Sequence, residues 1–101
     1  MARIVVASTA DADTDDIIAY LAAEAGRNTA ARYIALFDAL YDRLSIHPES
    51  CVKRPDLGPD ARIGIVKPFV VIYDYRPASN TVTILRILHG HRDIKLGLIS
   101  R

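Results

Sequence analysis

Two stretches dense in β-branched and aromatic residues dominate the second half of the chain. Residues 69–75 are Phe-Val-Val-Ile-Tyr-Asp-Tyr, and residues 82–88 are Val-Thr-Ile-Leu-Arg-Ile-Leu. Turn residues at 77–80 separate them, and this composition predicts a β-hairpin. Neither strand has a clean polar face, so we predict central strands covered on both faces. Strict alternation places Phe69, Val71, Tyr73 and Tyr75 on one face of the first strand, and Val82, Ile84, Arg86 and Leu88 on one face of the second.

The first half of the chain predicts one short strand followed by two helices. Residues 3–7 form a β-branched run, and the cap-type pair Ser8-Thr9 precedes an acidic stretch that suits a helix start. Apolar residues then recur at helical spacing up to Gly26, where we expect the helix to end. Asn28 is expected to cap a second helix that ends before Pro48. The short break between them predicts an antiparallel helical hairpin.

The remaining segments complete a predicted α+β fold. Residues 49–60 carry turn signals and predict a loop, residues 61–66 predict a strand, and the residues after Gly90 predict a short terminal helix. The order β-α-α-β-β-β(-α) predicts an antiparallel-type sheet with the N-terminal helical hairpin packed on one face, in a single domain of residues 1–101. We expect the other face to be apolar, to be left uncovered by the chain itself, and to be occupied by another polypeptide.

Composition excludes several classes of protein. A chain of 101 residues with 25% charged residues is typical of one folded domain, and a net charge of +1 gives no bulk basicity for nucleic-acid binding. Cys51 is the single cysteine, which favours a reducing compartment. No apolar run is long enough for a signal peptide or a membrane span. We therefore expect a cytoplasmic protein.

Several short motifs, in this order and spacing, resemble the RelE/ParE family of bacterial toxins. They are Ala-Tyr-Leu-Ala at 19–22, Ala-Arg-Tyr at 31–33, Leu-Ser-Ile-His-Pro at 44–48, Val-Val-Ile-Tyr-Asp-Tyr at 70–75 and Arg-Ile-Leu-His-Gly-His-Arg-Asp at 86–93. The resemblance covers almost the whole chain. It implies the toxin of a type II toxin–antitoxin system, neutralised by an antitoxin segment that wraps the toxin and fills its apolar grooves.

The same resemblance distinguishes two mechanisms. RelE-like members cut mRNA in the ribosome, and they carry an arginine after the aromatic that opens the hairpin strand; here that residue is Val70. Their terminal tyrosine falls near Leu98, which cannot titrate, while Arg92 matches a family arginine. The pattern therefore resembles the ParE branch, which implies a non-enzymatic toxin that inhibits DNA gyrase and binds a ParD-like antitoxin. The alternative is a RelE-like ribosome-dependent endoribonuclease that uses Arg62, Arg92 and a histidine at 89 or 91.

Four residues are candidates for partner binding. Arg62 and Arg92 are expected to flank the sheet and face an acidic partner. Arg86 lies mid-strand among apolar residues, where an ion pair with Asp74 across the hairpin competes with a partner contact. His89 is expected at the end of the strand, either hydrogen-bonded or solvated. We predict no metal site, because alternate residues such as His89 and His91 point to opposite faces of a strand, and we predict no cofactor or small-molecule substrate.

Overall fold

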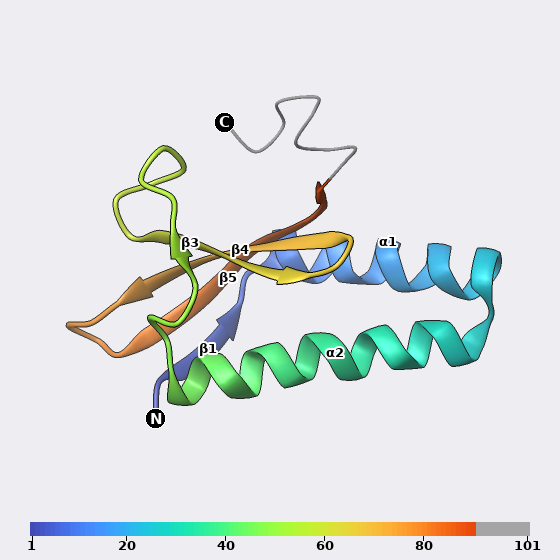
Figure 1. The fold of residues 1–101 in the computed structure, drawn as a ribbon, viewed down its shortest axis with the longest axis horizontal. Helices are drawn as coiled ribbons and strands as arrows, with labels where there is room; N and C mark the ends of the chain where they lie inside the picture. Colours follow the sequence, from blue (N-terminus) through green and yellow to red (C-terminus); the bar gives the residue numbers. More distant parts are fainter. Residues whose placement is uncertain (91–101) are drawn as a thin grey trace.

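The computed structural model describes residues 1–90, so the predicted C-terminal helix lies outside the described part (Figure 1). Its strands and helices follow the predicted order, with one additional short strand. The elements are β1 (Arg3–Val6), α1 (Ser8–Ala25), α2 (Arg27–Ile46), β2 (Val52–Lys53), β3 (Ala61–Val66), β4 (Phe69–Arg76) and β5 (Thr81–His89).

The helical hairpin forms as predicted, but its caps differ from the expected ones. Ala7 is the N-cap of α1, so Ser8 is already helical. Gly26 has a φ of 92°, which favours glycine, and it separates the two helices as a single residue. Asn28 therefore lies inside the first turn of α2 and does not cap it. Within residues 1–90, no helix combines the length and the apolar character that crossing a membrane requires.

The five strands form one mixed sheet in the order β1-β5-β4-β3-β2. The pairs β2–β3, β3–β4 and β4–β5 are antiparallel, whereas β1 runs parallel to β5, with Arg3 opposite Thr81. Parallel strands need a long connection, and here the helical hairpin and the strands β2 to β4 lie between β1 and β5 in the chain. The segment predicted as a loop, residues 49–60, contributes β2, which pairs with β3 through Val52 and Lys53.

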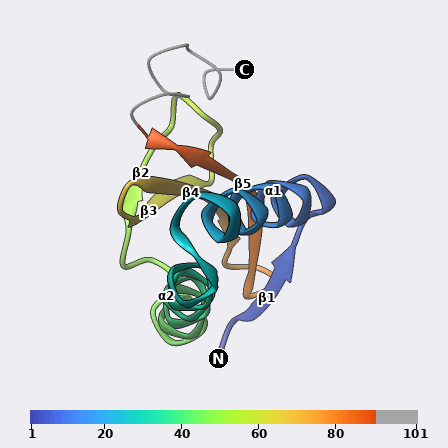
Figure 2. The same ribbon diagram turned by 90° about the vertical axis from the view of Figure 1, so that its right-hand side faces the viewer.

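Both helices pack on one face of the sheet, as Figures 1 and 2 show together. Side chains of α1, α2 and four strands form the main core there. In β4 the predicted alternation holds, because all four odd-numbered residues from Phe69 to Tyr75 contact this core. The fully buried members with the largest volumes are Tyr73, Leu44, Ile84, Ile87, Val71 and Val82.

A β-bulge in β5 breaks the predicted alternation of that strand. Ile72 lies opposite Arg86, but Tyr73 lies opposite Ile84, so Leu85 is the additional residue. The bulge shifts the pattern by one position, and therefore both Ile84 and Ile87 point to the helices. The prediction that Val82, Ile84, Arg86 and Leu88 share one face is wrong for this reason.

The face of the sheet away from the helices is not uncovered, contrary to expectation. Val70, Ile72 and Leu88 form a second buried cluster there, and each is 4–6% exposed. Leu57, Ile63 and Leu85 pack against this cluster, which we call the far-face cluster. Leu57 comes from the loop between β2 and β3, so residues of the chain itself help to cover the centre of this face.

Candidate partner-binding surface

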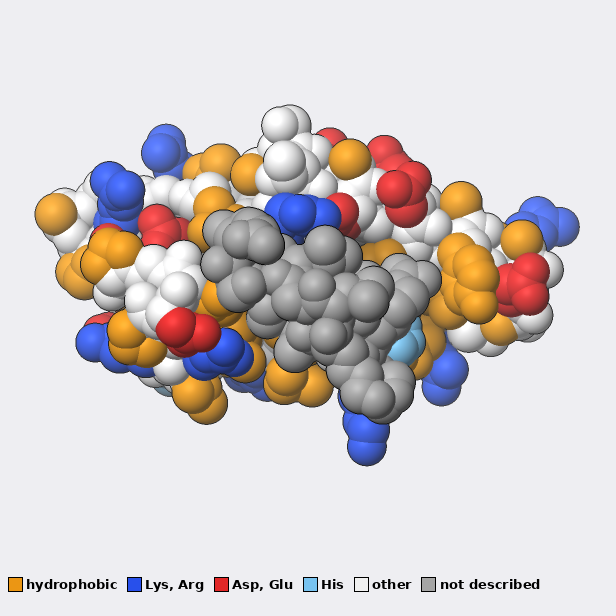
Figure 3. Space-filling view, turned by 90° about the horizontal axis from the view of Figure 1, so that it is seen from above, with side chains coloured by type: hydrophobic (Ala, Val, Ile, Leu, Met, Phe, Trp, Pro, Cys, Tyr) orange, Lys and Arg blue, Asp and Glu red, His pale blue; other side chains and the backbone are white. Residues whose placement is uncertain are grey.

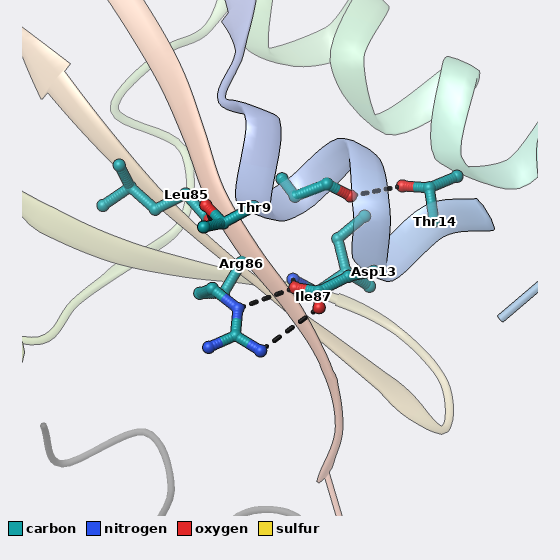
Figure 4. A network of polar contacts seen from close by, with 7 residues as sticks. Thr9, Asp13, Thr14, Leu85, Arg86 and Ile87 are labelled. Carbon is teal, nitrogen blue, oxygen red and sulfur yellow. Dashed lines mark hydrogen bonds and ion pairs between the residues drawn. The ribbon is translucent and has the colours of Figure 1, made fainter. Parts of the chain in front are cut away.

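Arg86 of β5 binds Asp13 of α1 in a bidentate ion pair (Figure 4). Arg86 Nε donates to Asp13 Oδ2 at 2.8 Å, and a terminal guanidinium nitrogen donates to Oδ1 at 3.1 Å. The Ile87 backbone N–H donates to the same Oδ2 at 2.9 Å. Planar pairing of this kind fixes both the position and the orientation of the guanidinium.

Asp13 occupies this place because the start of α1 lies along β5 where β1 has ended. The Ala7 N–H donates to Ile84 O at 2.9 Å, and the Thr9 hydroxyl donates to Leu85 O at 2.7 Å. One turn further along the helix, Asp13 accepts from the Ile87 N–H. The first turns of α1 thus satisfy backbone groups of β5 that β1 is too short to reach.

The predicted ion pair between Arg86 and Asp74 does not form. Asp74 instead lies 3.6 Å from Arg76 Nε within β4, and Arg86 binds Asp13. The Arg86 side chain is 46% exposed, whereas that of Asp13 is 17% exposed. The acidic half of the pair is therefore more buried than the cationic half.

Arg62 is not the exposed flanking cation that the sequence predicts, because only 8% of it is exposed. One terminal nitrogen donates to the backbone oxygens of Glu49 (3.1 Å) and Cys51 (2.8 Å). Its other terminal nitrogen lies 3.5 Å from the Glu49 carboxylate. Arg62 therefore anchors the segment between α2 and β2, and its role in partner binding stays a prediction.

Tyr73 anchors the same segment from the helix-side core. Its hydroxyl donates to Pro48 O at 3.0 Å, and its ring is fully buried. Burial raises the pKa of Tyr73 well above its usual value, and the neighbouring Cys51 adds to this effect. The phenol therefore stays protonated as a hydrogen-bond donor, and it has no acid–base role near neutral pH.

His89 lies at the end of β5, as predicted, in a group of aromatic rings around Phe69. The His89 and Phe69 rings meet edge to face with centroids 5.8 Å apart, and Tyr33 meets Phe69 in the same way at 5.6 Å. The Tyr33 hydroxyl donates to Lys67 O at 3.2 Å. His89 is half-buried.

The remaining candidate positions bear on the chemistry of the site. Arg92 lies outside the described residues. Val70, at the position of the nuclease arginine, is 5% exposed and belongs to the far-face cluster. Among residues 1–90, no three His, Cys, Asp or Glu side chains are grouped to hold a metal ion.

Figure 3 shows the molecule from above, turned by 90° from the view of Figure 1. Hydrophobic side chains there are interspersed with cationic and acidic ones over the described part of the molecule. Large apolar side chains are also exposed near the β2–β3 edge, where Val52 is 68% and Ile65 58% exposed. Mixed apolar and charged surfaces of this kind suit contact with another protein.

Comparisons with known proteins agree with this arrangement. Residues 4–94 match the family model described as ParE toxin of type II toxin-antitoxin system, parDE. The chain is 30% identical over 94 residues to Toxin ParE3 of Caulobacter vibrioides, covering 93% of this chain and 92% of the relative. A solved structure described as a chromosomal ParDE TA system from P. aeruginosa matches with a TM-score of 0.72 at 21% identity, over 88% of this chain and 96% of that one. The chain thus belongs to the ParE toxin family of type II toxin–antitoxin systems.

Proposed function

We propose that this protein is a non-catalytic toxin that binds and inhibits DNA gyrase and is neutralised by a ParD-like antitoxin. The observation that carries the proposal is the burial of Val70. RelE-like ribonucleases resemble this chain but carry an arginine at that position, whereas here an apolar side chain packs among Ile72 and Leu88. Cleavage of RNA needs a base, an acid and cations around one phosphate, and a buried valine removes one of these cations.

A role in protein binding is supported by the fixed position and the exposure of Arg86. Arg86 is fixed by Asp13 and half-exposed, so it can contact an acidic partner with little further loss of side-chain entropy. We propose Arg86, His89 and Arg92 as partner-contacting residues, with Arg62 acting through the segment that it anchors. The cytoplasm is the compartment in which we expect both partners, consistent with a single cysteine.

Two assays on the purified toxin distinguish gyrase inhibition from RNA cleavage. We expect the toxin to inhibit supercoiling of relaxed plasmid by purified gyrase, and the cognate antitoxin to restore it. Primer extension on mRNA from toxin-expressing cells should show no new cuts in the ribosomal A site. Cleaved transcripts together with unaffected gyrase would establish the ribonuclease alternative and overturn the proposal.

The antitoxin is tested through the gene beside the toxin. We expect that gene to encode a small protein that binds the toxin and relieves growth arrest when the two are co-expressed. Arg92→Ala should weaken toxicity or antitoxin binding while thermal unfolding stays unchanged. Loss of folding in this variant would assign Arg92 a structural role instead.

A further inference from the structure

We propose that the end of the sheet at the β3–β4 turn is a docking site for an acidic segment of the antitoxin. The site consists of Arg32, Tyr33, Lys67 and His89, and we call it the sheet-end site. It rests on the proposed function, because the antitoxin is the partner to which it is assigned.

Strand pairing and hydrogen bonds bring Tyr33, Lys67 and His89 together, and Arg32 lies against the Tyr33 ring. Phe69, the first residue of β4, lies opposite His89, the last residue of β5. The Gly90 N–H donates to Pro68 O at 2.9 Å, which holds the end of β5 against the β3–β4 turn. The Tyr33 hydroxyl reaches Lys67 O from α2. Both helices continue past this end of the sheet (Figure 1).

The sheet-end site carries positive charge. Arg32 and Lys67 are exposed, and neither forms an ion pair with a carboxylate of residues 1–90. The positions three and four residues from Arg32 along α2 hold Asn28, Thr29, Ala35 and Leu36, so no acidic side chain lies one helical turn away. Asp16 and Glu24 of the neighbouring helix α1 are exposed, and neither forms an ion pair with Arg32 or Lys67. Charge complementarity therefore favours an acidic occupant.

The aromatic rings of the sheet-end site favour a polypeptide over a nucleic acid as its occupant. Bases stack on exposed aromatic faces, but here Tyr33 and His89 pack edge to face against Phe69, which is 6% exposed. The Arg32 guanidinium also lies 5.3 Å from the centroid of the Tyr33 ring and occupies part of its surface. Two exposed cationic groups thus lie beside two half-buried rings, which suits carboxylates followed by an apolar side chain.

Charge reversal at the two exposed cations tests the site. The test variant is Arg32→Glu with Lys67→Glu. The matched control is Arg3→Glu with Lys53→Glu, which makes the same change in net charge at two exposed cations away from the sheet-end site, since Arg3 pairs with Thr81 and Lys53 with Arg62. Circular dichroism confirms the fold of each variant, and Arg32→Gln with Lys67→Gln is the milder replacement if the test variant does not fold.

Calorimetric titration with the full-length cognate antitoxin gives the readout at several salt concentrations. We expect the test variant to lose on the order of 100-fold in affinity and to show a weaker salt dependence, while the control changes by less than about threefold. Equal losses in both variants, or none in the test variant, would overturn the sheet-end site and leave the proposed function intact. A wild-type toxin that does not bind the antitoxin would overturn both. If the test variant binds a single-stranded RNA oligonucleotide more weakly than wild type does, while its affinity for the antitoxin is unchanged, the site would be reassigned to nucleic acid.

Discussion

Asp13 and Arg86, separated by 73 positions in the chain, join the first helix to the last strand through two hydrogen bonds. The same carboxylate accepts a backbone N–H from Ile87, so it has three donors. A carboxylate in this setting is a structural anchor, and it also decides where the guanidinium lies. Its removal should therefore change both stability and the surface offered to a partner.

We predict that Asp13→Ala lowers the free energy of unfolding by about 2–3 kcal/mol, because it leaves the Ile87 N–H and a half-buried guanidinium without this acceptor. Asp13→Asn should cost less, because its side-chain oxygen can still accept one hydrogen bond. Urea unfolding monitored by circular dichroism measures both. Asp15→Ala, at an exposed position of the same helix, is the control and should change stability by under about 0.5 kcal/mol.

Arg62 gives a second prediction. Arg62→Gln should destabilise the protein by about 2–4 kcal/mol, because the partly buried Glu49 and Cys51 carbonyls lose their hydrogen-bond donor. The exposed cation Lys53 provides the comparison, as Lys53→Gln should be nearly neutral. Thermal unfolding checks both variants. An Arg62→Gln protein of wild-type stability would show that the anchor is dispensable and would favour a role of Arg62 in partner binding.

Val71 tests the central strand of the main core. Val71→Asp buries a carboxylate at a position with 0% exposure, and the cost of more than about 4 kcal/mol should prevent folding or leave only a molten state. Val71→Ala removes two methyl groups at the same position and should cost about 2 kcal/mol. Near-ultraviolet circular dichroism and denaturant titration distinguish these outcomes. A folded Val71→Asp variant would contradict the assignment of this face to the core.

Tyr41 makes stability depend on pH in the alkaline range. Burial, aided by the negative charges of Asp38 and Asp11, raises the pKa of Tyr41 from 10.0 to about 12. The unfolded chain therefore loses this proton first, and the stabilisation that is present below pH 10 is lost as the pH rises toward 12. The loss should stay below about 1.4 kcal/mol per pH unit, because the half-buried ring is partly solvated.

The alkaline effect is measured by denaturant unfolding at pH 9 to 12 in wild type and Tyr41→Phe. The substitution should make the decline shallower without abolishing it, because Tyr73 also has a raised pKa. Tyr20→Phe, at a residue 65% exposed, is the matched control and should leave the slope unchanged. Identical slopes in wild type and Tyr41→Phe would show that Tyr41 does not contribute.

Much of the fold could be predicted from periodicity. The apolar spacing in residues 8–46 predicted the helical hairpin, and the β-branched runs predicted β1, β3, β4 and β5. The strand β2 was missed, because two residues among turn signals carry no periodic pattern and become a strand only through pairing with β3. The faces of β5 were predicted wrongly because the bulge at Leu85 leaves no trace in the alternation itself.

The candidate site was less predictable, because side-chain partners depend on tertiary packing. Asp74 was the natural acceptor for Arg86 in a hairpin, yet the bulge and the position of α1 bring Asp13 there instead. The acidic stretch at 11–16 was interpreted as a helix start, and this interpretation could not tell which carboxylate turns toward the sheet. Arg62 lies in a strand that the sequence did predict, but its burial depends on Glu49 and Cys51 of the preceding segment.

The way in which α1 lies along β5 has a consequence for self-association. Thr9 and Asp13 hold the Leu85 carbonyl and the Ile87 amide, the positions that an incoming strand would need in order to extend the sheet on that flank. A β-strand of another molecule could add here only after α1 had detached, which would remove Ile17 and Leu21 from their contacts with the core. Two polar side chains thus oppose strand addition and fibril growth on β5 beyond the end of β1.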